Sequence, residues 1–204
     1  MPKQNRVTPF STLIATPERG MLNGNRGCLH DDQEQIRRQF RGVRWIICLL
    51  EFKGRRHPIM KPGRYTDLFF LDEATAVAAG HRPCAECQRG RFNLFREHWA
   101  RANPEFTDSA RPLAPVIDTV LHDERLNSNR LCSSITDLPD GTFVSLNEID
   151  AFLVLRGQLH LWTPAGYERP KSKIEFPVRI LTPSSVLNAL VAGYPVSLHP
   201  SAIS

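Results

Sequence analysis

The sequence lacks the features that mark secreted, membrane-spanning and well-characterised catalytic proteins. Its longest apolar runs, such as WIICLL at 45–50, are far shorter than the roughly 20 residues that a membrane-spanning helix needs. The first ten residues, MPKQNRVTPF, contain no apolar stretch of the kind found in a secretory signal. No P-loop, GxGxxG, HExxH, GxSxG or complete HNH-type motif is present. We therefore expect a soluble, cytoplasmic protein without a membrane partner, and no catalytic motif assigns it a reaction.

Cysteine is scarce, and its number is odd. The chain of 204 residues has five cysteines, whereas a disulfide framework favours an even number in a smaller secreted chain. Reduced thiols, some of them on a metal ion, fit this pattern better. Two of the five, Cys84 and Cys87, stand three apart in GHRPCAECQRGRF (80–92), directly before a predicted helix.

Three interpretations of the Cys84–Cys87 pair remain open. A C-x2-C pair at a turn that enters a helix supplies two zinc ligands, and the helix N-terminus favours the thiolate form. The same spacing occurs in thioredoxin-like redox motifs, but those follow directly on a strand, and here the predicted helix LDEATAVAAG (71–80) comes first. The third interpretation is two buried thiols. We favour Zn²⁺, for which the single CxxC supplies only half of the ligands.

The other zinc ligands must come from elsewhere in the chain. His57 follows a predicted strand at 44–52 in a bend, where it could present a ligand. Cys28 forms a C-x-H pair with His30, whose spacing lets both side chains point the same way in an extended segment. Cys48 lies in the apolar strand and is interpreted as a core residue. We therefore favour His57 and Cys28; the full set of candidates is Cys28, His30, His57, Cys48, His81 and Cys132.

Positive charge is concentrated in the first half of the chain. The net charge is +5, made up of +8 over residues 1–102 and −3 over residues 103–204. A basic half suggests an anionic partner, with nucleic acid as the usual candidate, although a solvated arginine-rich face would have the same composition. In RRQFRGVRW and FKGRRHP, arginines alternate with aromatic residues. We expect the arginines to contact phosphate and the aromatics to belong to the core; the arginines are Arg38, Arg41, Arg55 and Arg56.

The pattern of apolar and turn residues predicts an α+β fold. Residues 15–32 are predicted to form a long loop with turns at Asn23-Gly24 and Arg26-Gly27, and NPEFTDSARP (103–112) is predicted to be a linker. We expect a basic metal-binding domain at 1–104 and a β-rich α+β domain at 105–204. The predicted helices begin near residues 72, 82, 115 and 184, and strands are predicted at 44–52, 66–70, 141–146, 150–157, 158–164 and 176–183.

A second candidate site lies in the loop NGNRGCLHDD (23–32). His30 beside Asp31 could act as a general base or as a ligand of a second metal ion, because polar, glycine-rich loops often carry sites. This gives a metal-dependent hydrolase as an alternative function, with His30 and Asp31 as catalytic residues. A non-catalytic protein-interaction module, docking through the β-rich half, is a further alternative.

The run LFFLDEATAVAAGHRPCAEC (68–87) resembles the zinc-binding N-terminal domain of the Ada DNA-repair methyltransferase. A strand, an alanine-rich helix, a glycine and RPCxxC follow one another in the same order, and the resemblance covers about residues 44–90. It implies a small zinc fold that contacts nucleic acid in DNA repair or modification. Cys84 and Cys87 match the second cysteine pair of that family, while His57 and Lys53 stand where the first pair would be. The methyl-accepting cysteine of the family therefore has no counterpart at these positions.

Overall fold

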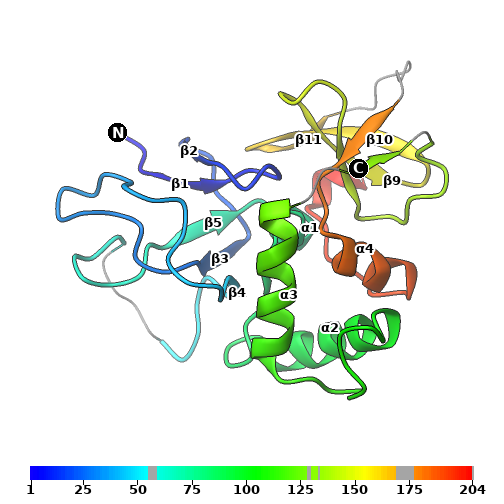
Figure 1. Ribbon diagram of the computed structural model, residues 1–204. Helices are drawn as coiled ribbons and strands as arrows, with labels where there is room; N and C mark the ends of the chain where they lie inside the picture. The colour runs from blue at the N-terminus through cyan, green and yellow to red at the C-terminus, as the bar shows by residue number, and fades with distance from the viewer. Residues whose placement is uncertain (55–58, 128–129, 133, 169–176, 204) are drawn as a thin grey trace.

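The computed structural model describes residues 1–54, 59–127, 130–132, 134–168 and 177–203 (Figure 1). It confirms the mixed α+β fold, with two six-stranded sheets in the described part of the chain. In Figure 1 the strands of the first half lie on one side of helix α3 (Ala114–Asn127), and β9 (Ala151–Leu155) and β10 (Gln158–Thr163) lie on the other.

The first sheet is built from the first half of the chain in the strand order β2-β1-β5-β3-β4-β6. One face of this sheet packs into the core, where Val7, Ile47, Leu68 and Phe70 are fully buried. Because side chains alternate along a strand, their neighbours point to the other side, which we call the outer face. The strands are β1 (Gln4–Val7), β2 (Leu13–Ala15), β3 (Leu22–Asn25), β4 (Ile46–Cys48), β5 (Leu68–Phe70) and β6 (Arg82–Pro83).

Two expectations for the first half were wrong. The predicted loop at 15–32 contains strand β3, where Gly24 is needed for close packing and not for a turn. A Cβ atom at Gly24 would lie 2.2 Å from the carbonyl oxygen of Ile46 on the neighbouring strand. The predicted strand at 44–52 shortens to β4, and Leu50 is exposed because the chain has left the sheet by then.

The helices before and after the cysteine motif follow the sequence closely. Helix α1 (Glu73–Ala78) begins at Asp72, whose carboxylate accepts a hydrogen bond from the Thr75 N–H at 2.8 Å, and Gly80 takes the left-handed conformation (φ 80°) beyond its end. Helix α2 (Arg89–Ala102) begins later than predicted, so both cysteines lie in the turn before it. Its predicted apolar stripe is buried, and consists of Phe92, Phe95 and Trp99.

The second half forms the second sheet, in the order β11-β10-β9-β8-β12-β7. Helix α3 precedes this sheet, and α4 (Ser184–Val191) follows it. The remaining elements are β7 (Arg130–Cys132), β8 (Phe143–Ser145), β11 (Gly166–Glu168), β12 (Val178–Ile180) and the short 3-10 helix η1 (Pro200–Ala202). Within the described residues, no helix combines the length and the apolar character that crossing a bilayer requires.

The halves of the chain share their hydrophobic cores. Phe95 and Trp99 of α2 belong to one buried cluster with Val186, Leu190 and Tyr194 from the C-terminal segment. In a second cluster, residues of α1 pack with residues of the second sheet. The boundary predicted at 104/105 separates regions of different composition, but side chains from both sides of it pack together.

Candidate metal centre

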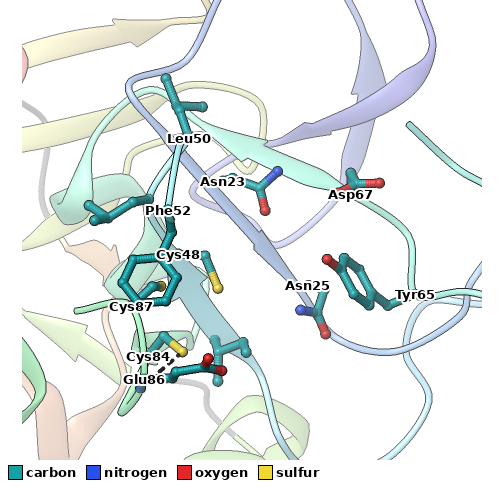
Figure 2. Close-up of a pocket in the computed structure, with 12 residues that line it drawn as sticks. Asn23, Asn25, Cys48, Leu50, Phe52, Tyr65, Asp67, Cys84, Glu86 and Cys87 are labelled. Carbon is teal, nitrogen blue, oxygen red and sulfur yellow. Dashed lines mark hydrogen bonds between the residues drawn. The ribbon is translucent and has the colours of Figure 1, made fainter. Parts of the chain in front are cut away.

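Three cysteines form a compact cluster on the first sheet (Figure 2). The sulfur atoms of Cys48, Cys84 and Cys87 all lie within 4.8 Å of one another. Cys48 ends strand β4, whereas Cys84 and Cys87 belong to the turn between β6 and α2. All three are free thiols and half-buried. Such a cluster could hold a metal ion, since thiolates are strong ligands of zinc and other soft cations.

Strand pairing explains how Cys48 comes to lie beside Cys84. Strands β4 and β6 are parallel, with Ile46 opposite Arg82 and Ile47 opposite Pro83. Continuing this register by one residue places Cys48 opposite Cys84. The Cys84 N–H donates to the Ile47 carbonyl at 2.8 Å, which keeps the two chains together beyond the last formal pair.

A tight turn then returns Cys87 to the cluster. The backbone N–H of Gln88 donates to the Cys84 carbonyl at 3.1 Å and closes the turn. The side-chain amide of the same residue donates to the Ile47 carbonyl at 2.9 Å, which ties the turn to β4. The positions of all three sulfur atoms therefore follow from the β4–β6 pairing and from Gln88.

A buried ion pair fixes β6 from the opposite side. The guanidinium of Arg82 donates to both carboxylate oxygens of Asp118 on α3, each at 2.8 Å, and both side chains are almost fully buried. Bidentate pairs of this kind restrict orientation as well as distance. Strand β6, which leads directly into Cys84, is therefore held between β4 and α3.

Electrostatics single out Cys84 as the thiolate of the cluster. Its pKa is lowered to about 5, chiefly because the Cys48 thiol donates a hydrogen bond to it, and backbone N–H groups add to this effect. One of those donors is the Glu86 N–H, at 3.4 Å from the sulfur. Hydrogen bonding to Cys84 and burial raise the pKa of Cys48, and burial is the main cause of a raised pKa at Cys87. A bound cation would favour the thiolate form of all three.

The cluster lies in the wall of a hollow of about 260 Å³ on the outer face, which we call the cysteine hollow. Asn23 and Asn25 of β3 and Glu86 of the turn also line this hollow (Figure 2). Phe52, expected in the core, is half-buried and lines this hollow. Ligands other than the cysteines could therefore approach an ion here.

The ligand set expected from the sequence is only partly brought together. Cys84 and Cys87 meet as expected, but the third sulfur is that of Cys48, so its interpretation as a core residue is corrected. Cys28 is not part of the cluster, and its sulfur lies 3.6 Å from the His30 carbonyl oxygen. His57 lies outside the described residues.

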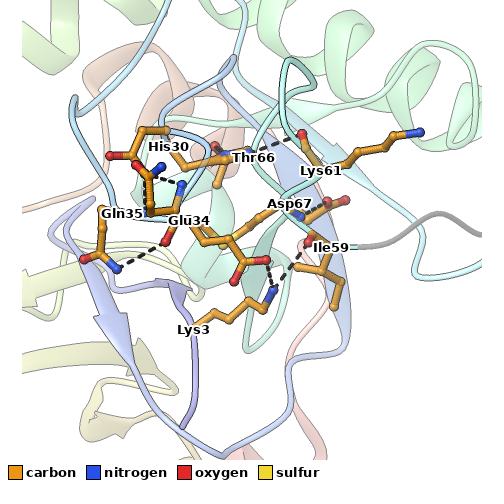
Figure 3. A network of polar contacts seen from close by, with 11 residues as sticks. Lys3, His30, Glu34, Gln35, Ile59, Lys61, Thr66 and Asp67 are labelled. Carbon is orange, nitrogen blue, oxygen red and sulfur yellow. Dashed lines mark hydrogen bonds and ion pairs between the residues drawn. The ribbon is translucent and has the colours of Figure 1, made fainter.

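His30 connects two loops of the first half (Figure 3). Its imidazole is buried, with Nδ1 2.6 Å from the Thr66 hydroxyl and Nε2 3.3 Å from the Lys61 carbonyl oxygen. The Leu29 N–H donates to the same hydroxyl at 2.8 Å, so Thr66 joins the His30 ring to the backbone of its own loop. Both ring nitrogens therefore have structural partners, and these contacts do not favour the predicted role as a general base.

Asp31 likewise organises its own loop. Its carboxylate accepts hydrogen bonds from the backbone N–H groups of Gln33 and Gln35 and from the guanidinium of Arg37. The hydrogen bond from the Gln35 N–H is the main cause of the lowered pKa of Asp31, and those from Arg37 and Gln33 add to it. This arrangement is that of a turn stabilised by a side chain, which is the ordinary structural role of aspartate.

The remaining candidate ligands lie away from the cluster. His81 is fully buried against the rings of Trp45 and Phe70. Cys132 is in the second sheet, where its thiol donates to the Ser134 carbonyl at 2.7 Å.

The arginines of the basic half fall into two groups. Arg38 and Arg41, predicted to contact nucleic acid, are exposed, and Arg55 and Arg56 lie outside the described residues. By contrast, Arg26 is fully buried and its guanidinium carbon lies 4.6 Å from the ring centre of Trp45. Part of the positive charge therefore serves packing, which the composition alone does not reveal.

No protein-family model, curated protein or solved structure matches this chain. The fold and the site together define an α+β protein with a three-cysteine cluster that could hold a metal ion.

Proposed function

We propose that the chain is a zinc protein that contacts nucleic acid, in which Cys48, Cys84 and Cys87 supply three of the metal ligands. The observation that supports the metal is the approach of the three sulfur atoms to within 4.8 Å of one another. In a tetrahedral site with Zn–S bonds of about 2.3 Å, sulfur atoms are separated by roughly 3.8 Å. Small side-chain adjustments would therefore be enough to close the cluster around an ion.

A third thiolate favours a metal over a redox pair. A dithiol–disulfide cycle needs two cysteines, whereas zinc sites use three or four nitrogen or sulfur ligands. A C-x2-C redox motif does not need a third cysteine, so a redox function would not explain why Cys48 lies opposite Cys84. His57 is kept as the candidate for the fourth ligand on the basis of the sequence.

Contact with nucleic acid is supported by charge and by the resemblance of residues 44–90 to the Ada zinc domain. The first half carries a charge of +8 over residues 1–102. The side chains of Arg38 and Arg41 are exposed in this half, where they could meet phosphate groups. A role in DNA repair or modification rests on the resemblance.

The metal proposal is tested by elemental analysis of purified single-site variants. We expect stoichiometric zinc in the wild-type protein and its loss in Cys48→Ser, Cys84→Ser and Cys87→Ser. The matched controls Cys28→Ser and Cys132→Ser should keep it. Loading with cobalt should produce thiolate-to-metal absorption bands in the wild type and in both controls. A wild-type protein that binds no divalent ion after purification under reducing conditions would overturn the proposal.

Nucleic-acid binding is tested by titrating the zinc-loaded protein with duplex DNA at several salt concentrations. We expect affinity to fall as salt rises, because phosphate binding by arginine releases counterions from the DNA. The dependence on salt is measured as the slope of the logarithm of the binding constant against the logarithm of the salt concentration. Arg38→Gln and Arg41→Gln should each reduce the magnitude of this slope by roughly 1 if the arginine neutralises one phosphate. Arg156→Gln, at an exposed arginine in the turn between β9 and β10, is the control and should change neither the affinity nor its dependence on salt. Absence of binding to any nucleic acid at low salt would contradict this part of the proposal.

A further inference from the structure

The outer face of the first sheet carries an ordered row of side chains that leads away from the cysteines. Strand pairing places Cys48 opposite Asn23, Asn23 opposite Phe69, and Phe69 opposite Arg6. Directly paired residues point to the same face, so this row runs across four strands on the outer side of the sheet. Phe69 thus lies in the middle of the row, between the metal site and a cation.

A second hollow, of about 390 Å³, lies at the Arg6 end of this row. It is lined by Phe69 and, among others, by Arg6, Lys3 and Arg19, and it shares Leu50 with the cysteine hollow. We call it the phenylalanine hollow. Its volume falls within the range of about 300–1,000 Å³ typical of sites for small organic groups.

The charge on the wall of the phenylalanine hollow is positive. Three cationic side chains line it, together with the carboxylate of Glu18. One of the three, Lys3, is also ion-paired with Glu34, so Arg6 and Arg19 supply the remaining positive charge. Arg6 is buried and donates to two carbonyl oxygens, those of Pro164 and Glu18, so its position is fixed. Arg19 is exposed at the hollow, where it can meet an anion at the surface.

Phe69 is the apolar part of the site. It is half-buried, although the residues before and after it in β5 are fully buried in the core. An aromatic ring on a sheet, with cations beside it, is the arrangement on which single-stranded nucleic acids stack their bases.

We propose that the phenylalanine hollow binds a single-stranded segment of nucleic acid, with one unpaired base stacked on Phe69 and the adjoining phosphate held by Arg19. This inference rests on the proposed function and names the form of nucleic acid and the surface that receives it. A base within a duplex would have to leave its base stack before it could stack on the half-buried ring of Phe69. Binding of a single strand, whose bases are unpaired, is therefore favoured over binding of a duplex. The strand would continue along the outer face toward Asn23 and the cysteine hollow.

The test compares zinc-loaded protein binding to oligothymidine, to oligouridine and to a DNA duplex of equal length, at low salt and neutral pH. We expect a single strand to bind more tightly than the duplex. Phe69→Leu, which keeps an apolar side chain but removes the ring, should weaken single-strand binding by roughly 5- to 150-fold. Phe106→Leu is the matched control, because Phe106 is exposed beyond the end of α2, where it stacks on Trp99. Arg19→Gln should also weaken binding, and its control is Arg156→Gln.

The possible outcomes separate a failure of this inference from a failure of the proposed function. Equal binding of duplex and single strand, unaffected by Phe69→Leu but weakened by Arg38→Gln, would overturn the inference and leave the proposed function standing. No binding of any nucleic acid would overturn both. Binding of octanoate in the hollow without binding of an oligonucleotide would identify a site for a small amphiphilic anion, and would also overturn the inference. Tighter binding of either oligothymidine or oligouridine would support it and distinguish DNA from RNA.

Discussion

The imidazole of His81 is a fully buried polar group packed between aromatic rings. Its ring centre lies 5.0 Å from that of Trp45 and 4.7 Å from that of Phe70, and neither nitrogen has a hydrogen-bond partner in the described part of the chain. Burial lowers the pKa of His81 well below its usual value, and the charges of Arg26 and Arg125 add to this effect. The ring is therefore neutral in the folded state.

A neutral buried histidine makes stability depend on pH in a known direction. The unfolded chain takes up a proton near pH 6.5, whereas the folded chain does so only at much lower pH, so the free energy of unfolding falls as pH drops below 6.5. His81→Phe removes this proton uptake and two unpaired buried nitrogens. We compare the free energy of unfolding of the variant with that of the wild type. As the pH is lowered from neutral to roughly pH 5.5, we expect this difference to shift in favour of the variant by about 1.4 kcal/mol. Urea unfolding of both proteins at the two pH values measures it, and a difference that stays constant would contradict the assignment.

Among the elements, the β9–β10 hairpin is the one whose turn the sequence indicates most directly. Leu155 ends β9 and Gln158 begins β10, so Arg156 and Gly157 alone form the loop. Both have positive φ, 51° and 71°, as a type I′ turn requires. Glycine adopts this conformation readily, whereas arginine does so at a cost.

Replacing Arg156 by a residue better suited to this turn should stabilise the protein. Asn tolerates positive φ, and the Arg156 N–H that donates to Asp140 at 2.6 Å is a backbone group that the substitution keeps. We expect Arg156→Asn to raise the free energy of unfolding by about 0.5–1 kcal/mol. Arg156→Val, with a β-branched side chain, should lower it. Denaturant midpoints of the two variants would show the opposite order if the loop had another conformation in solution.

At the scale of the whole molecule, the C-terminal segment connects the two halves. Glu73 of α1 accepts hydrogen bonds from the Tyr194 hydroxyl and from the Ser197 N–H. The preceding residue, Asp72, accepts from the Tyr167 hydroxyl and from the His199 N–H. The acidic residues at the start of α1 thus hold the second sheet and the chain end beside the first sheet.

The fragment 1–104 is therefore expected not to fold by itself. Without α4 and the chain end, Phe95 and Trp99 would lose the buried partners that now cover them. We expect this fragment to show no cooperative thermal transition by circular dichroism, and addition of the fragment 105–204 to restore one. A cooperative transition of 1–104 alone, with full zinc uptake, would instead support two independent domains.

The sequence by itself determined the local features of this protein. Spacing and turn residues were enough to predict the C-x2-C pair before a helix, the cap at Asp72, the buried stripe of α2 and the Arg156-Gly157 hairpin, because each depends on residues close together in the chain. The mixed α+β fold also followed from such patterns. Where local composition misled, as at Gly24, the cause was close approach of a strand from elsewhere in the chain.

Only the tertiary structure decided the third member of the cysteine cluster. Cys48 lies in an apolar run, and nothing around it in the sequence distinguishes a ligand from a core thiol. Its position opposite Cys84 is set by the register of two short parallel strands. A shift of this register by one residue would turn the Cys48 side chain to the other face of the sheet. Register between distant strands depends on the packing of the entire core, so the site emerges only once β4 and β6 are paired.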